Sequence, residues 1–513
     1  MASIKPSVPK GTRDFSPAEM VKRNYIFDTI KSVFRKYGYQ QIETPTMENS
    51  STLMGKYGEE GDRLIFKVLD SGEYLEKTLT YKKLLDLSGQ TLHQRQLQDK
   101  VLASMDSKTN SDTLNSTILA AQGKQSEIES QLIYFINESL TSKRITSEIS
   151  EKALRYDLTV PFARYVVQHQ NEITFPFKRF QVQPVWRADR PQRGRYREFY
   201  QCDADVVGSD SLLNEAEFIM IYDEALTQLG LKDFSIKINN RKILSGIAQV
   251  IDKADNIIDL TVAIDKLDKI GLDGVIKELL EKGFTDADID KLKPVILLEG
   301  NNTEKLANLR EALAQSEIGL KGCDEIETVF GYIERCPLQT AKLELDITLA
   351  RGLNYYTGAI FEVKTNEVNM GSIGGGGRYD DLTGMFDSKQ RLTGAGISFG
   401  ADRIYDVLEE LNLFPAGSNQ TTQVLICNFD KEGELYSLPL LQQLRRHNIN
   451  TELYPAGAKI KKQMEYANNK NIPYVVVIGD DEMQTGLLTF KDMASGVQEK
   501  LTADEIVAKL NRD

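Results

Sequence analysis

The sequence predicts an α+β protein in which an antiparallel sheet carries helical insertions and a separate α/β domain follows at the C-terminus. Segments such as "FSIKIN" and "GAIFEVKT" alternate apolar and polar residues, as half-buried strands do. Helical stretches lie between these strands, an order that favours an antiparallel core. After "FPAGSNQ", strands and helices alternate over a length typical of one compact domain.

The N-terminal region begins with a helix that is marked at both ends. Ser16 can cap it, Pro17 suits the first turn, Glu19 completes a capping box, and Gly38 can end it. The segment "YQQIETPTME" then predicts a strand that Pro45 interrupts, so we expect it at an edge or a contact surface rather than at a sheet centre.

Two stretches differ in composition and hydrophobic pattern from the predicted strands. Residues 71–149 are rich in polar residues, yet residues 128–140 keep helical apolar spacing, which indicates a helical insertion whose role the sequence does not reveal. The segments "LRYDLTVPFARYV" and "FKRFQVQPVW" have strand-like patterns. The pattern of residues 241–339 predicts a small inserted helical domain. We expect a core over residues 1–420 and a second domain over residues 421–513.

Composition excludes several classes of protein. The chain has 63 Lys and Arg against 75 Asp and Glu, a net charge of −12, which argues against a wholly basic nucleic-acid wrapper but leaves room for local basic patches. Four cysteines without a C-x-x-C pair, and only three histidines, argue against a disulfide scaffold or a zinc site. No signal peptide or membrane-spanning run is evident, so we expect a cytoplasmic protein without a membrane partner.

The segment "VWRADRPQRGRYREFYQCDADVVG" places five arginines in eleven residues between two strand-like runs. A guanidinium at a strand end offers a rigid fork to a carboxylate or a phosphate. The alternative is a solvated basic loop, and the residues alone do not decide between the two interpretations.

Three further segments carry candidate chemistry. In "LARGLNYYTGAIFEV", Arg351 leaves a strand, and Tyr355 and Tyr356 either line a flat pocket or pack in the core. The run "GSIGGGGRYDDLTGMF" is either a flexible loop or a floor on which a ligand lies against bare backbone, and it lacks the spacing of a P-loop or a dinucleotide loop. In "GAGISFGADRIYDVL", Arg403 falls in the first turn of a predicted helix, where anions are favoured.

Together these segments resemble the class II aminoacyl-tRNA synthetases, and specifically the histidyl-tRNA synthetase family. "YGYQQIETPTME" resembles motif 1, Arg187 with "GRYREFYQ" resembles motif 2, and "GISFGADRI" resembles motif 3. "LARGLNYYTGAIFE" and "GGGGRYDDL" resemble the two boxes that separate the histidine enzymes from their relatives. The resemblance runs from Lys10 to the C-terminus, apart from residues 71–149.

The resemblance implies a class II catalytic core, an anticodon-binding domain over residues 421–513 and a homodimer. It implies a histidine–tRNA ligase that activates L-histidine with ATP to histidyl-adenylate and transfers histidine to the 3′ end of tRNA(His). Mg²⁺ would sit on the pyrophosphate oxygens, and no metal ligand from the chain is identified. The sequence does not show which group takes the proton in the transfer step.

The resemblance also assigns roles to individual residues. Arg187 should hold the carboxylate and the α-phosphate, Arg351 should lie beside the α-phosphate, and Arg403 should hold the γ-phosphate and the adenine face. Asp205 should accept a hydrogen bond from an imidazole N–H. The implied sets are, for histidine, Asp157, Leu158, Thr159, Arg187, Gln201, Asp205, Arg351, Tyr355, Tyr356 and Tyr379; for ATP, Arg187, Asp189 and Arg403; and for the tRNA acceptor end, Arg190, Gln192 and Arg193.

Two residues depart from the family pattern. Asn354 stands where the family usually has Asp, which removes a charge beside Arg351, and Asp189 replaces a Glu, which shortens the reach toward the adenine amino group. Two other functions compete with the ligase. One is a silent paralogue, the regulatory subunit of ATP phosphoribosyltransferase, which typically lacks the C-terminal domain and degrades the histidine boxes. The other is a class II synthetase for glycine, threonine or proline, which lacks those boxes.

Overall fold

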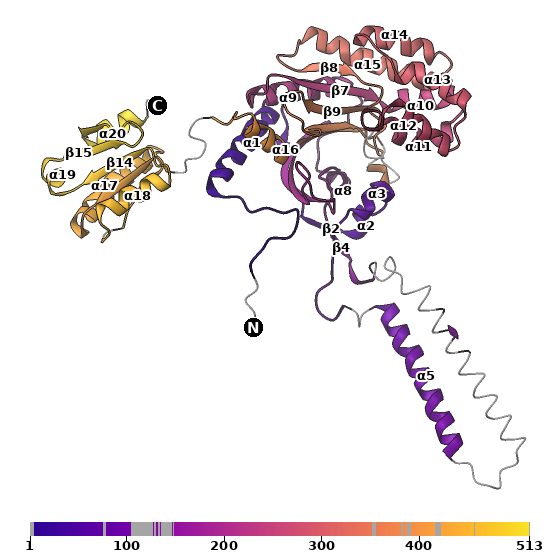
Figure 1. The fold of residues 1–513 in the computed structure, drawn as a ribbon, viewed down its shortest axis with the longest axis horizontal. Helices are drawn as coiled ribbons and strands as arrows, with labels where there is room; N and C mark the ends of the chain where they lie inside the picture. Colours follow the sequence, from indigo (N-terminus) through magenta and orange to yellow (C-terminus); the bar gives the residue numbers. More distant parts are fainter. Residues whose placement is uncertain are drawn as a thin grey trace, which may run out of the picture.

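The computed structural model describes residues 5–74, 78–103, 148–350, 355–380, 383–386, 391–415, 422–455 and 457–511, with a few isolated positions between 127 and 146. Arg351 and Asn354 lie outside these residues, as does most of the helix predicted over residues 128–140. The part of the insertion that is described forms one long helix, α5 (Leu79–Ala103), which extends away from the body of the protein (Figure 1).

An eight-stranded sheet forms the centre of the described core. Its strands run in the order β1 (Gln40–Gln41), β5 (Phe177–Trp186), β6 (Glu198–Val207), β11 (Gly394–Gly400), β10 (Gly374–Arg378), β9 (Ala359–Thr365), β7 (Phe234–Asn240) and β8 (Lys342–Leu345). All neighbours are antiparallel except the two edge pairs, β1 with β5 and β7 with β8. The predicted α+β class with an antiparallel core is therefore confirmed.

Three helices cover one face of this sheet: α1 (Pro17–Lys36), α9 (Leu213–Gln228) and α16 (Ala401–Glu410) (Figure 1). The capping box predicted for α1 is present, with Ser16 and Glu19 exchanging hydrogen bonds. Between the helices and the sheet, the ring of Phe399 lies 4.7 Å from that of Tyr222 and 5.8 Å from that of Phe34. The apolar core covers this face of the sheet. Side chains alternate along a strand, so the polar side chains of the same strands point to the other face, where they can form a site.

The strand predicted over "YQQIETPTME" is divided at Pro45, as expected. Its first part is β1 at the edge of the large sheet. Its second part is β2 (Met47–Asn49), which belongs to a three-stranded sheet with β4 (Lys152–Leu154) and β3 (Lys67–Val68). Short helices α2 (Ser50–Leu53) and α3 (Gly58–Arg63) follow β2.

The prediction of a strand over "LRYDLTVPFARYV" is wrong for the second half of this segment. Only β4 is extended, and α8 (Thr159–His169) is a helix with a buried apolar face. The carboxylate of Asp157 accepts a hydrogen bond from the backbone N–H of Val160, which supplies an N-terminal partner. Pro161 is tolerated because it falls in the first turn. The β-branched residues that suggested a strand are accommodated by packing instead.

The segment after β7 is helical. It comprises α10 (Arg241–Val250), the short η1 (Ala254–Asn256), α11 (Ile257–Ile264), α12 (Leu267–Glu281), α13 (Asp286–Ile296), α14 (Asn302–Ala312) and α15 (Glu317–Arg335). These helices gather beside the β7–β8 edge of the sheet (Figure 1). The chain then returns to the sheet through β8, and another short helix, η2 (Thr383–Met385), follows β10.

The C-terminal residues form a second sheet with its own apolar core. The strand order is β13 (Thr451–Leu453), β12 (Val424–Asn428), β14 (Tyr474–Ile478), β15 (Leu488–Asp492) and β16 (Gln498–Leu501). The helices are α17 (Lys431–Arg446), α18 (Ile460–Asn469), α19 (Asp480–Thr485) and α20 (Ala503–Leu510). Residues of these elements alone make up the core, so this unit is expected to fold by itself. Across the described residues, none of the helices is both long and apolar enough to span a membrane.

Candidate active site

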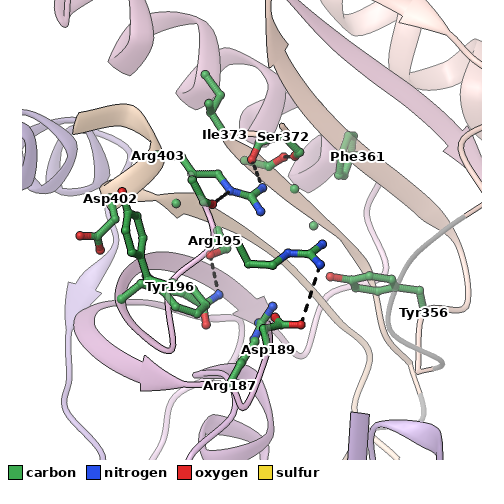
Figure 2. Close-up of a pocket in the computed structure, with 18 residues that line it drawn as sticks. Arg187, Asp189, Arg195, Tyr196, Tyr356, Phe361, Ser372, Ile373, Asp402 and Arg403 are labelled. Carbon is green, nitrogen blue, oxygen red and sulfur yellow. Dashed lines mark hydrogen bonds and ion pairs between the residues drawn. The ribbon is translucent and has the colours of Figure 1, made fainter. Parts of the chain in front are cut away.

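A cavity of about 290 Å³ lies against strands β6, β9, β10 and β11 of the large sheet (Figure 2). Its walls are the loop between β5 and β6, the strand β10 and the start of α16. Three arginines from these walls line it: Arg187 at the end of β5, Arg195 in the loop, and Arg403 in α16. Arg195 and Arg403 point into the space that Tyr356 bounds (Figure 2). Two of the five clustered arginines, Arg187 and Arg195, thus line a cavity, and Arg403 joins them from α16.

Arg403 is held by backbone carbonyl groups. Its Nε donates to the carbonyl oxygen of Gly194 at 2.6 Å, and a second nitrogen donates to that of Ser372 at 2.5 Å. Burial lowers the pKa of Arg403, and the charges of Arg195 and Arg187 lower it further. Because like charges meet here in a partly dehydrated space, this end of the cavity is prepared for an anion.

Arg187 is fixed from two sides. Its Nε donates to the carbonyl oxygen of Tyr156 at 3.1 Å, and its guanidinium lies 4.3 Å from the centre of the Tyr156 ring. The hydrogen bond and the stacking contact fix the plane of the guanidinium, so its remaining N–H donors point in set directions. Arg187 can therefore present a preset fork to a carboxylate or a phosphate in the cavity.

Below the cavity lies a group of buried carboxylates, the first of which is Asp157. One of its oxygens accepts hydrogen bonds from the Tyr57 hydroxyl at 2.9 Å and the Val160 N–H at 3.1 Å. The other accepts from the Tyr355 hydroxyl at 3.1 Å. Burial raises the pKa of Asp157, and these hydrogen bonds oppose the rise. Tyr355 is therefore a buried core residue that holds Asp157, whereas its neighbour Tyr356 lines the cavity.

Asp205 is the second buried carboxylate. The Tyr379 hydroxyl donates to its Oδ1 at 2.6 Å, and the Arg179 guanidinium lies 2.7 Å from its Oδ2. Burial raises the pKa of Asp205 as well. Each carboxylate oxygen has two lone pairs, so one further donor can still be accepted on either oxygen.

Asp203 is a third buried carboxylate, which sequence reasoning missed. It is 2% exposed, and burial raises its pKa to about 7, with Asp205 and Asp157 adding to the rise and Arg179 opposing it. Among the described residues, its Oδ1 is buried without a hydrogen-bond partner, as is the Oε1 of Gln201. The strand period of two in "QCDAD" places Gln201, Asp203 and Asp205 on one face, and this signal could have found it. Arg179 and Tyr57 were missed too, since a buried arginine and a distant tyrosine carry no local pattern.

The four glycines of β10 do not all serve the cavity. A Cβ atom on three of them would overlap the protein's own atoms. It would lie 2.6 Å from Tyr222 at Gly374, 2.2 Å from Gly396 at Gly376, and 2.7 Å from Ala359 at Gly377. At Gly375 the nearest atom is the carbonyl oxygen of Phe361 at 3.2 Å. The sequence offered this run as a floor for a ligand, and among the four glycines only Gly375 would direct a methyl group toward the cavity without first overlapping the protein's own atoms.

We therefore predict that Gly375→Ala and Gly376→Ala have different effects. Gly375→Ala should fold normally and weaken ligand binding about tenfold, since a methyl group would project into the cavity. Gly376→Ala should lower the free energy of unfolding by about 1–3 kcal/mol or more, because the methyl group meets backbone. Thermal unfolding together with titration of ligand binding measures both. Equal stability loss in the two variants would contradict this assignment.

The structure brings most of the predicted residues together. Arg187, Asp189, Gln201, Tyr356 and Arg403 line the cavity, whereas Asp157, Asp205, Tyr355 and Tyr379 lie buried below it, and Leu158 and Thr159 stand at the start of α8. Arg190 and Gln192 are exposed in the loop, and Arg193 pairs with Glu410 on α16. No cluster of three metal-ligating side chains occurs in the described parts of the chain.

An antiparallel sheet with a glycine strand, an arginine-bearing loop between two strands and an arginine at the helix after the last strand defines a class II aminoacyl-tRNA synthetase core. A family model described as histidyl-tRNA synthetase matches residues 11–77 and 141–404, and one described as an anticodon binding domain matches residues 423–513. The chain belongs to the histidyl-tRNA synthetase family. It is 55% identical over 498 residues to the histidine–tRNA ligase of Christiangramia forsetii, with 97% of each chain covered.

Solved structures agree with this placement. The crystal structure of histidyl-tRNA synthetase from Nostoc sp. PCC 7120 matches with a TM-score of 0.75 and 28% identity, covering 99% of this chain and all of that one. An ATP phosphoribosyltransferase regulatory subunit/histidyl-tRNA synthetase from Bacillus halodurans matches with a TM-score of 0.65 and 19% identity, covering 90% and 97%. The second match shows the fold alone, so the fold does not separate the enzyme from the regulatory paralogue, and the site must.

Proposed function

We propose that this protein is a histidine–tRNA ligase. The carboxylate of histidine attacks the α-phosphorus of ATP and pyrophosphate leaves; a ribose hydroxyl at the 3′ end of tRNA(His) then attacks the acyl carbon and AMP leaves. The observation that carries the proposal is the charge of the pocket. Arg187, Arg195 and Arg403 line the cavity, and the buried carboxylates Asp157, Asp203 and Asp205 lie behind its wall, around Tyr356. An amino acid with a cationic or N–H-donating side chain fits between them.

The buried end suits histidine in particular. Its ammonium group and imidazole N–H would donate to the carboxylates, with Asp205 accepting from the imidazole and a tyrosine hydroxyl serving the other nitrogen. An apolar amino acid of the same size would leave the orphaned oxygens of Asp203 and Gln201 unpaired. Sites that leave their own buried polar groups unpaired discriminate strongly.

The open end suits ATP, which class II synthetases use as their substrate. Arg187 would hold the carboxylate and the α-phosphate, and Arg403 the γ-phosphate and the adenine face. Asp189, which lines the cavity 4.0 Å from Arg195, would accept from the adenine amino group. The family resemblance adds Arg351 beside the α-phosphate. The attacking carboxylate is already ionised, so positioning and charge neutralisation supply the acceleration, without a general base.

Mg²⁺ would enter with the nucleotide and neutralise charge on the pyrophosphate oxygens. The residues present fit this role, because Mg²⁺ in such sites is held by one or two carboxylates and substrate phosphates rather than by a full protein cage. Two carboxylates line the cavity, those of Asp189 and Asp402. Asp402 already forms ion pairs with two arginines, Arg13 and Arg23. Asp189 is assigned to the adenine amino group, so the substrate phosphates and water would hold most of the ion's coordination sphere.

The tRNA would be bound by both units. In the loop, Gln192 offers a donor and an acceptor to a base edge, and Arg190 can hold a phosphate. Arg193 would first have to leave Glu410. The C-terminal unit, residues 421–513, would bind the anticodon, with Lys461 and Lys462 of α18 supplying positive charge. A homodimer formed through motif 1 and a cytoplasmic location complete the proposal.

ATP–pyrophosphate exchange with each standard amino acid tests the function. We expect exchange with histidine alone. Exchange with no amino acid would favour the regulatory paralogue, and exchange with glycine, threonine or proline would show a different synthetase. The match of residues 423–513 to an anticodon binding domain favours the ligase over the regulatory protein.

The pKa of Asp203 gives a prediction for stability. Its pKa of about 7 lies above the usual value near 3.9. A raised carboxyl pKa means that folding favours the protonated form, so this contribution to stability is lost as the pH rises from about 4 through 7. Asp203→Asn should therefore raise the melting temperature of the free protein by about 2–4 °C at pH 8 and change it little at pH 5.

The same substitution should weaken histidine binding, because it removes a buried negative charge facing a cationic ligand. Melting temperatures at pH 5 and pH 8, with and without histidine, measure both effects. A variant that is destabilised equally at both pH values would show that Asp203 contributes packing and not charge.

A further inference from the structure

The N-terminal residues 10–13 lie across the loop between β5 and β6. The backbone N–H of Arg197 donates to the carbonyl oxygen of Gly11 at 2.8 Å, and its guanidinium donates to that of Lys10 at 3.4 Å. Gly11 has φ +88°, and a Cβ atom there would lie 2.9 Å from side-chain carbons of both Arg197 and Pro191. Glycine is therefore required for the segment to lie this close to the loop.

Arg13 connects the same loop to α16. Its guanidinium pairs with Asp402 at 2.6 Å and with Asp406 at 3.6 Å, and it stacks 3.7 Å from the centre of the Tyr196 ring. The Tyr196 hydroxyl donates to Asp406 at 2.7 Å. One side chain thus touches both walls of the cavity.

Both walls carry nucleotide-binding groups. Tyr196 and Asp402 line the cavity, on the same side in Figure 2, and Asp402 immediately precedes Arg403. Asp402 has two anchors besides Arg13, since Arg23 pairs with it at 2.5 Å and the N–H of Tyr200 donates to it at 2.8 Å. Loss of Arg13 would therefore leave Asp402 in place and remove the stacking contact on Tyr196, which would keep only its hydroxyl bond to Asp406 on this side of the loop.

We propose that residues 10–13 form a strap that sets the separation between the loop and α16, with Arg13 as a positioning residue for the nucleotide. The proposal rests on the proposed function in that the nucleotide is ATP. Arg403 contacts the loop through Gly194, so a shift of the loop displaces the groups around the phosphates. Small displacements of such groups lower rates severalfold to a hundredfold. The buried carboxylates below the cavity do not contact the strap.

Two variants disturb opposite parts of the strap: Arg13→Ala removes its contact with Tyr196, and Gly11→Ala forces it off Arg197. Lys22→Ala is the matched control, because Lys22 pairs α1 with Glu409 of α16 at 2.8 Å without touching the loop. We expect both strap variants to raise the KM for ATP in pyrophosphate exchange at least tenfold. The KM for histidine should stay within twofold, and Lys22→Ala should change neither. Arg13→Lys should restore part of the loss, since it keeps the charge but not the stacking.

Calorimetric titration with a non-hydrolysable ATP analogue separates failure of the strap from failure of the proposed function. It detects weakened nucleotide binding in Arg13→Ala even if no amino acid supports exchange. The proposal is overturned if Arg13→Ala binds the analogue within twofold of the parent. It is also overturned if the KM values for ATP and histidine rise by the same factor. A lower melting temperature with both KM values unchanged would overturn it as well, since either result marks a general structural role.

Discussion

Replacing Arg187 by alanine should lower the rate of histidine-dependent ATP–pyrophosphate exchange by about a hundred- to a thousandfold. In the proposed complex the Arg187 guanidinium contacts both the carboxylate and the α-phosphate, and removal of one such donor commonly costs about 3–4 kcal/mol in the transition state. The fold should survive, because Arg187 is only partly buried and its Nε donates to a single backbone carbonyl group, that of Tyr156.

Arg310→Ala is a matched control, since Arg310 pairs with Asp324 and Glu327 in the helical segment, outside the cavity. It should exchange pyrophosphate at the parent's rate. Exchange by Arg187→Ala within threefold of the parent would remove Arg187 from the chemistry.

Removing Thr421–Asp513 should leave histidine activation largely intact and reduce the charging of tRNA(His) by at least about a hundredfold, as expected when phosphate contacts are lost. The C-terminal unit has its own core, and none of the cavity residues belongs to it. Exchange and charging measured on the same preparation separate the two half-reactions. If both fell by the same factor, the C-terminal unit would support the catalytic core and not only the tRNA.

The parts of this fold that the sequence predicted are those with strong local signals. The capping box of α1, the proline break before β2 and the alternation of β7 and β9 are each defined by nearby residues. The helix α8 was missed because its β-branched residues favour a strand locally, and its start depends on the buried carboxylate of Asp157. Tertiary packing overrode propensity there.

In the site, too, the residues with local sequence signals were predicted and the contacts set by tertiary packing were not. Arg187, Arg403 and Tyr356 were found because they stand in short recognisable segments, whereas Arg179 and Tyr57 were missed. The partners that set their chemistry come from elsewhere in the chain: Tyr57 reaches Asp157 across 100 residues, and Tyr379 reaches Asp205 across 174. Such pairs depend on sheet order and register, which no local pattern encodes. The roles of the β10 glycines also became clear only from the strands beside them.

The central claim is that the acidic buried end binds the amino and imidazole groups while the arginines bind the carboxylate. Calorimetric titration of histidine and of histidinol, in which an alcohol replaces the carboxylate, tests it directly. For Arg187→Ala, histidine should bind at least tenfold more weakly and histidinol about as before, since about 1.4 kcal/mol corresponds to tenfold. For Asp205→Asn, both ligands should bind more weakly by a similar factor. The claim would be contradicted if Arg187→Ala weakened both ligands equally, or if Asp205→Asn left histidinol binding unchanged.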